Sequence, residues 1–223
     1  MRHFLRTASR TVKAGLADLQ SAFVYQKIKW LYPRVRLGRN VRFYGSIHLR
    51  IAKTATVRIG DNVTFRSATA HNFVGINRPV SIYVGEHATL EIGANCGFSG
   101  TALYVSTRIT IGDYCNFGGN SSVWDTDFHP LDYQLRRAGI VGTKTAPIQI
   151  GSDVFVGANA MVLKGVTIGD RAIIGAGSVV ARRVPADQIW GGNPARFIRG
   201  LASDVPDAEH PERLEKSLAA SLT

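Results

Sequence analysis

The 223-residue sequence has little of several features that define special classes of protein. Its two cysteines, Cys96 and Cys115, are too few for a disulfide framework and form no CxxC or Cys/His zinc motif. No apolar run reaches the roughly 18 residues that a membrane-spanning helix needs. The N-terminus lacks the continuous apolar stretch of a signal peptide, because Arg, Lys, Asp and Gln interrupt it. We therefore expect a cytoplasmic protein.

Negative charge is also scarce, since 16 acidic residues stand against 27 Lys and Arg, a net charge of +11. The excess is concentrated near the N-terminus. Residues 1–42 contain ten basic residues and one acid, Asp18, and the remainder of the chain is close to neutral. The positive charge therefore belongs to an appendage, and it lacks the interleaved aromatic residues of a nucleic-acid-binding surface.

The remaining chain contains a repeat of six residues. From residue 150 an aliphatic residue occupies every sixth position, in the series Ile150, Val156, Val162, Ile168, Ile174 and Val180. This period fits neither a helix nor a plain strand. It fits a coil with three flat faces, in which each aliphatic residue stacks on the one eighteen residues later. Many of the 23 glycines then serve at sharp corners.

The same rhythm occurs in shorter runs from about residue 35, so we predict an all-β solenoid over residues 35–200. Cys96 and Cys115 fall at small corner positions of the repeat, which predicts two core residues. The period lapses between His129 and Pro147, which indicates a loop at about 130–147.

The flanks differ from the coil. Residues 12–31 carry apolar residues at helical spacing, and Pro33 ends that helix, so residues 1–34 form a basic amphipathic segment. Residues 201–223 are expected to form a tail with a short helix at 207–221.

Six stretches resemble motifs of the hexapeptide-repeat acyltransferases, in particular the maltose/galactoside and polysaccharide O-acetyltransferase group. They are residues 111–113 (IGD), 125–130 (DTDFHP), 150–157 (IGSDVFVG), 165–170 (GVTIGD), 174–180 (IGAGSVV) and 191–196 (GGNPAR). Their order and combination are specific, whereas any single hexapeptide is a weak signal. The resemblance covers residues 110–200 closely, and residues 35–110 agree with it in period.

The resemblance implies a left-handed parallel β-helix that forms a homotrimer with active sites between adjacent subunits. It implies direct transfer of an acetyl group from acetyl-CoA to a sugar or glycan hydroxyl, without a metal, as in polysaccharide biosynthesis. His129 is then the general base that takes the proton from the acceptor hydroxyl, a task that suits imidazole near neutral pH. We expect it at the surface of the coil, in the six-residue register.

The acceptor site is less defined. Asp125 and Asp127 are candidates to orient the ring of His129 or to hold the acceptor, although each is also typical of a solvated turn. Related sugar acetyltransferases bind the acceptor with an Asn on an earlier coil, and Ser99 occupies that position here. Asn120 is a possible substitute. A sugar, an amine and an amino-acid hydroxyl all remain open as acceptors.

The resemblance also places the donor along the last coils. The implied contacts are Phe155, Gly157, Ala158, Ala176, Arg182, Arg183, Arg196 and Arg199. Backbone N–H groups at the small residues would bind the pantetheine amides or the developing oxyanion. The arginines would bind the CoA phosphates, although each is equally consistent with a surface residue of a terminal coil.

Two other functions remain open. A zinc protein of the γ-class carbonic anhydrase type needs three converging histidines, and His71, His87 and His129 are far apart in sequence. A non-catalytic scaffold or binding protein would keep the coil without the chemistry.

The basic amphipathic segment has two interpretations. Its apolar stripe and scattered basic residues are typical of an interfacial helix, which predicts peripheral association with an anionic membrane. Alternatively, the helix packs on the coil or on a neighbouring subunit.

Overall fold

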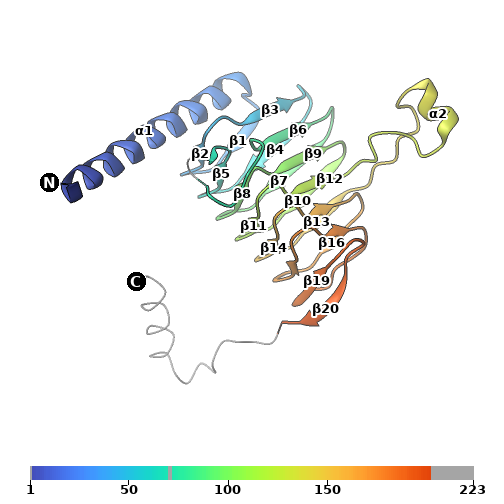
Figure 1. Cartoon of the computed structure of the whole chain (residues 1–223). Coiled ribbons are helices and arrows are strands. Elements are labelled where there is room, and N and C mark those ends of the chain that lie inside the picture. The colour runs from blue at the N-terminus through green and yellow to red at the C-terminus, as the bar shows by residue number, and fades with distance from the viewer. Residues whose placement is uncertain (1, 70–71, 202–223) are drawn as a thin grey trace.

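The computed structural model describes residues 2–69 and 72–201, with side chains from Gly15 onward except that of Leu16. Within these residues, three sheets form the faces of a coil (Figure 1). Sheet A contains β1 (Val35–Leu37), β4 (Thr56–Ile59), β7 (Thr89–Ile92), β10 (Arg108–Ile111), β13 (Ile148–Ile150) and β16 (Thr167–Ile168). Sheet B contains β2 (Arg42–Tyr44), β5 (Thr64–Arg66), β8 (Gly97–Ser99), β11 (Asn116–Phe117), β14 (Phe155–Val156), β17 (Ile173–Ile174), β19 (Gln188–Gly191) and β20 (Arg196–Gly200). Sheet C contains β3 (His48–Ile51), β6 (Ser81–Val84), β9 (Ala102–Val105), β12 (Ser122–Trp124), β15 (Met161–Val162) and β18 (Val179–Val180).

The chain visits the sheets in the order A, B, C, and each strand pairs in parallel with the strand one turn away. Ile150 pairs with Ile168, Val156 with Ile174, and Val162 with Val180, so the predicted stacking is confirmed. The fold is a left-handed parallel β-helix, as the motifs predict. The antiparallel hairpin of β19 and β20 ends it.

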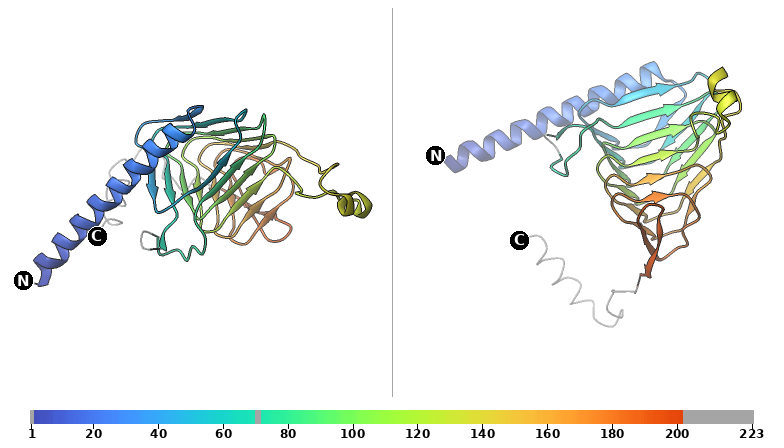
Figure 2. Two further views of the ribbon diagram at one scale, coloured as in Figure 1. Left: turned by 90° about the horizontal axis from the view of Figure 1, so that it is seen from above. Right: turned by 45° about the vertical axis from the view of Figure 1, so that its right-hand side comes forward.

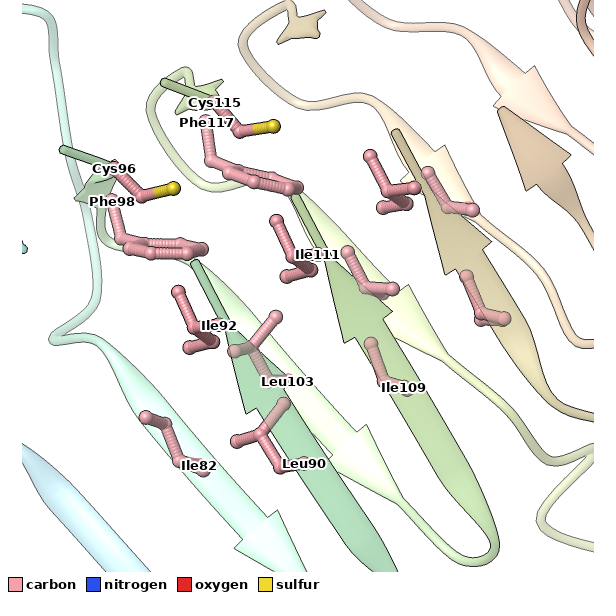
Figure 3. Close-up of a cluster of buried hydrophobic side chains, with 14 of the residues drawn as sticks. Ile82, Leu90, Ile92, Cys96, Phe98, Leu103, Ile109, Ile111, Cys115 and Phe117 are labelled. Carbon is pink, nitrogen blue, oxygen red and sulfur yellow. The ribbon is translucent and has the colours of Figure 1, made fainter. Parts of the chain in front are cut away.

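The core is a set of stacked columns inside the coil (Figure 3). Phe43, Phe65, Phe98 and Phe117 stack in one column, with ring centroids 5.3, 5.2 and 4.7 Å apart. Cys96 and Cys115 lie beside this column, and both are buried and free. A hydrogen bond with Cys96 and burial raise the pKa of the Cys115 thiol, which keeps it protonated and unreactive. Their predicted place in the core is confirmed.

Helix α1 (Arg2–Leu31) lies across the N-terminal end of the coil (Figures 1 and 2). It begins ten residues before the stretch with helical spacing, residues 12–31, and lies within the predicted segment of residues 1–34. Ala17, Ser21 and Ile28 bury one of its faces against the first turns, and the Ser21 hydroxyl accepts a hydrogen bond from the Phe43 N–H at 2.9 Å. Among the described residues, neither helix is both long enough and apolar enough to span a bilayer.

A long loop leaves the coil after β12 and returns at β13. It carries α2 (Tyr133–Ala138), whose N-cap Asp132 accepts from the N–H groups of Gln134 and Leu135. The loop projects on the side away from the free end of α1 (Figures 1 and 2). It begins at Asp125 rather than near residue 130, so His129 lies in the loop and outside the six-residue register. The helix expected at 207–221 lies outside the described residues.

Candidate functional site

Two of the coil's corners hold the candidate residues. We call the junction between sheets B and C the B–C corner; its described residues are 45–47, 67–69, 72–80, 100–101, 118–121, 157–160 and 175–178. The junction between sheets C and A is the C–A corner; it comprises residues 52–55, 85–88, 106–107, 125–147, 163–166 and 181–183. His129 belongs to the C–A corner.

The surroundings of His129 fix its backbone and leave its ring exposed. The preceding Phe128 packs edge-on against Tyr104 and Trp124, with ring centroids 4.7 and 5.3 Å apart. The following Pro130 is buried, whereas His129 is exposed. Within the part of the chain that the structure describes, the imidazole makes no hydrogen bond or ion pair. It is therefore available to a ligand.

The two arms of the loop are tied together at its base. Thr126 forms an antiparallel bridge with Thr145, and the Asp127 N–H donates to the Lys144 carbonyl at 3.0 Å. The Ala146 N–H donates to the Asp125 carbonyl, also at 3.0 Å. Because His129 lies two residues beyond these three backbone contacts, they fix the position of its backbone relative to the coil.

Asp125 has a structural task. Its carboxylate is fully buried and accepts from three backbone N–H groups of the preceding C–A corner, those of Ser106, Thr107 and Arg108, at 2.6, 2.7 and 2.9 Å. The Thr107 hydroxyl donates a fourth bond at 2.9 Å. No hydrogen bond among the described residues joins Asp125 to His129, so the structure does not give it the orienting or acceptor-binding role that the sequence suggested.

Asp127 is differently placed. Its Oδ1 forms an ion pair with the Nζ of Lys164 at 2.8 Å, and its Oδ2 is buried without a hydrogen-bond partner among the described residues. The Oδ2 atom of Asp127, two residues before His129, can therefore still accept a hydrogen bond. Lys164 was not predicted, because 37 residues separate it from its partner.

Glycines bring successive turns into close contact at the B–C corner. A Cβ on Gly118 would lie 2.5 Å from the Ala158 nitrogen, and one on Gly157 would lie 2.5 Å from the Ala176 nitrogen. The Gly157 N–H itself donates to the Ile174 carbonyl at 2.8 Å, so it is not available to a ligand.

Three N–H groups at equivalent positions of this corner are unpaired. Those of Gly119, Ala158 and Ala176 find no acceptor among residues 2–69 and 72–201; Gly119 is buried, Ala158 half-buried and Ala176 exposed. They belong to consecutive turns, which lie about 4.8 Å apart, so they form a ladder of donors along the corner. We call them the donor column. The sequence identified two of its three members; Gly119 was missed.

A loop that is described over residues 67–69 and 72–80, which we call the 67–80 loop, covers the upper end of this column, on the turn that carries β11. Asn120 holds it, because its Oδ1 accepts from the Asn77 N–H at 2.9 Å and its Nδ2 donates to the Gly75 carbonyl at 3.1 Å. Ser99 accepts a hydrogen bond from Asn72 Nδ2 at 2.7 Å. Both residues predicted to bind the acceptor are thus engaged with the loop, although the Ser99 hydroxyl keeps its own proton to donate.

The remaining predicted donor contacts are all exposed, but they divide between sheet B and the C–A corner. Phe155 lies on the outer face of sheet B, and Arg196 and Arg199 lie on β20, with Arg196 opposite Gly191 next to the B–C corner. Arg182 and Arg183 lie at the C–A corner. Within one chain, therefore, sheet C separates His129, Arg182 and Arg183 from the donor column.

A metal centre finds no support in the described ranges, which bring no three His, Cys, Asp or Glu side chains together. Two clefts of about 360 and 500 Å³ lie beside α1 and contain none of the candidate residues.

Comparison with known proteins agrees with this geometry. Residues 147–182 match the family described as bacterial transferase hexapeptide (six repeats). The galactoside O-acetyltransferase of Escherichia coli is 35% identical over 122 residues, which cover 54% of this chain and 58% of that protein. A Staphylococcus aureus protein to which an acetyltransferase activity has been assigned by inference is 42% identical over 81 residues. The match spans 36% of this chain and 40% of the relative's length.

A solved structure extends the likeness to nearly the whole chain. The hexapeptide-repeat acetyltransferase of Vibrio cholerae is 28% identical, with a TM-score of 0.56 over 90% of this chain and 93% of that one. The same protein has been solved in complex with acetyl coenzyme A, and this structure is similar at 29% identity and a TM-score of 0.55 over 86% and 87% of the two chains. The resemblance to hexapeptide-repeat acyltransferases is thus confirmed.

Proposed function

We propose that this protein is an acetyl-CoA-dependent O-acetyltransferase that works as a homotrimer, with His129 as its general base and a sugar or glycan hydroxyl as its acceptor. The donor fits the Vibrio cholerae relative, which binds acetyl coenzyme A, and the acceptor fits the galactoside O-acetyltransferase.

The observation that carries the proposal is the height of the two half-sites along the coil. β11 and β12 belong to one turn; Gly119 follows the first at the B–C corner, and the His129 loop follows the second at the C–A corner. A rotation about an axis parallel to the coil leaves the position of every residue along that axis unchanged. In a cyclic assembly of this kind, His129 of one copy stands level with the top of the donor column of the next copy.

This arrangement orients the donor. The N–H groups of Ala158 and Ala176 bind the pantetheine carbonyls, and Arg196 at the last turn binds phosphate. Arg182 and Arg183 reach the same cleft from the neighbouring copy, because they share a corner with His129. The thioester then lies at the other end of the column, where Gly119 is buried beneath Val74. Its N–H stabilises the oxyanion once the Val74 side chain moves aside.

The chemistry needs one proton shuttle. The acceptor oxygen attacks the thioester carbon while the imidazole of His129 takes its proton. The C–S bond then breaks, and the proton passes from His129 to the departing thiolate. The Asp127–Lys164 pair positions the loop, and the free Asp127 Oδ2 accepts a hydrogen bond from the acceptor or the ring.

The proposal is tested by thiol release from acetyl-CoA with a panel of methyl pyranosides and serine as acceptors. His129→Asn should lower kcat by about 10²–10⁴-fold, the usual contribution of a general base. His87→Asn is the matched control, since His87 is also exposed. The alternative, a non-catalytic scaffold, predicts acetyl-CoA binding without thiol release for any acceptor.

We also propose that the enzyme works in the cytoplasm and that α1 holds it at an anionic membrane surface. Leu19, Phe23 and Trp30 are 69%, 69% and 82% exposed. They lie within about 40° of one another around the helix and opposite the face that packs on the coil. With the basic residues of the N-terminal segment, this stripe suits an interfacial helix better than a helix packed only on its own coil.

Sedimentation with vesicles tests this localisation. Binding is expected to vesicles containing phosphatidylglycerol and not to pure phosphatidylcholine. The double substitution Phe23→Ser and Trp30→Ser should abolish it, whereas Phe73→Ser, an exposed aromatic residue elsewhere, should not. If the double substitution instead dissociates the oligomer, the stripe is a subunit contact.

A further inference from the structure

The 67–80 loop has a fixed base and an exposed apolar tip. The side chain of Arg78 fixes the base, because its guanidinium donates to the carbonyls of Gly100, Asn120 and Ser121 and to the Ser122 hydroxyl, over 2.6–3.0 Å. At the tip, Phe73 is 97% exposed and Val74 is 52% exposed. The Phe73 ring therefore contributes almost nothing to the folding of this chain, although the loop that carries it is anchored at its base.

The tip lies beside the top of the donor column. A Cβ on Gly119 would be 3.1 Å from the Val74 Cγ1, so Val74 covers the corner at which the highest free N–H is found. Asn72 binds Ser99 on the turn above. If the donor lies as proposed, the thioester ends next to this tip, and the acceptor must enter between the tip and His129 of the neighbouring copy.

We propose that Phe73 contacts the acceptor and selects one with a flat apolar face, such as the C–H face of a pyranose ring. This inference rests on the proposed function. Stacking of a ring on that face removes apolar surface from water on both partners, which favours a sugar over the small polar side chain of serine. Asn120 and Arg78 act as positioning residues that hold the base of the loop, and Asn72 positions its tip, because its Oδ1 accepts from the Val74 N–H at 3.0 Å and its Nδ2 donates to Ser99.

The test compares the steady-state kinetics of Phe73→Trp, Phe73→Leu and Phe73→Ala for the best pyranoside of the panel. Phe73→Ala should lower kcat/KM for the sugar by about tenfold, mostly through KM, and leave the KM for acetyl-CoA unchanged. Phe73→Trp should keep the wild-type value, and Phe73→Leu should resemble Phe73→Ala because it lacks a flat face. Tyr114→Ala is the matched control, since it also removes an aromatic ring from a residue that is 58% exposed and belongs to neither proposed site.

Three results would overturn the inference. One is an unchanged sugar kcat/KM in Phe73→Ala, and another is full activity in Phe73→Leu. The third is dissociation of the oligomer by Phe73→Ala, measured by light scattering, because the ring would then be a subunit contact. Failure of the proposed function has a different signature, the absence of acetyl transfer by the wild-type protein.

Discussion

At the scale of single residues, Asp125 and Asp127 show how neighbouring positions of one motif divide between structure and function. The Asp125 carboxylate accepts four hydrogen bonds inside the coil, whereas the Oδ2 atom of Asp127 has no hydrogen-bond partner among the described residues. The sequence alone could not separate them, because both stand in the same DTDFHP stretch. What distinguishes them is the turn at residues 106–108, which the solenoid brings to Asp125 from the preceding coil.

Replacing Asp125 by Asn should destabilise the protein by about 2–3 kcal/mol, since an amide nitrogen would face backbone N–H groups that need an acceptor. Asp127→Asn should cost much less, because it alters a partly exposed ion pair. Urea unfolding followed by circular dichroism measures both. Equal losses would contradict the structural assignment of Asp125.

Asp187 gives a prediction about pH. Hydrogen bonds from the Arg171 guanidinium, at 2.6 and 2.7 Å, hold the pKa of its carboxyl below the ordinary value. The folded-state pKa is therefore lower than the unfolded one, so this stabilisation is complete above about pH 4 and is lost as the pH falls through the folded value. Asp187→Asn should flatten the acid limb of a melting-temperature profile, and Asp153→Asn should not. If the melting temperature of Asp187→Asn falls with decreasing pH as steeply as that of the wild type, the Arg171–Asp187 pair does not contribute to stability.

At the scale of elements, the sequence predicts what repeats and misses what is held by distant contacts. The six-residue period specifies the three faces and their stacking, because the inward residue that recurs at each sixth position is aliphatic or aromatic. The 67–80 loop appears in the sequence only as a lapse of that period. Its anchor could not be predicted, since Arg78 reaches Ser122 across 44 residues.

Arg78→Lys should release this loop. A lysine cannot make the forked set of bonds that the guanidinium makes to four acceptors, and burial, which lowers the pKa of Arg78, also disfavours a compact charge at that place. Amide hydrogen exchange should quicken at least about tenfold over residues 72–80, while the strands of sheet A stay protected. Uniform exchange across the coil would mean general destabilisation, and unchanged exchange would mean that the arginine is not the anchor.

At the scale of the whole molecule, one chain holds two halves of a site and no complete one. His129, Arg182 and Arg183 stand at the C–A corner, and the donor column stands at the B–C corner. Motifs supply the residue types of both halves, but only the folded coil shows that sheet C keeps them apart.

The most direct test mixes two inactive variants by unfolding and refolding them together. His129→Ala lacks the base, and Ala176→Glu places a carboxylate on the donor column, where it repels the anionic donor. If each site joins His129 of one copy to the column of the next, random mixing at equal amounts repairs about a quarter of the clefts. Thiol release should then return to about a quarter of the wild-type rate, and a mixture of His129→Ala with the double variant should stay inactive. A mixed sample that remains as inactive as its two parents would contradict the account.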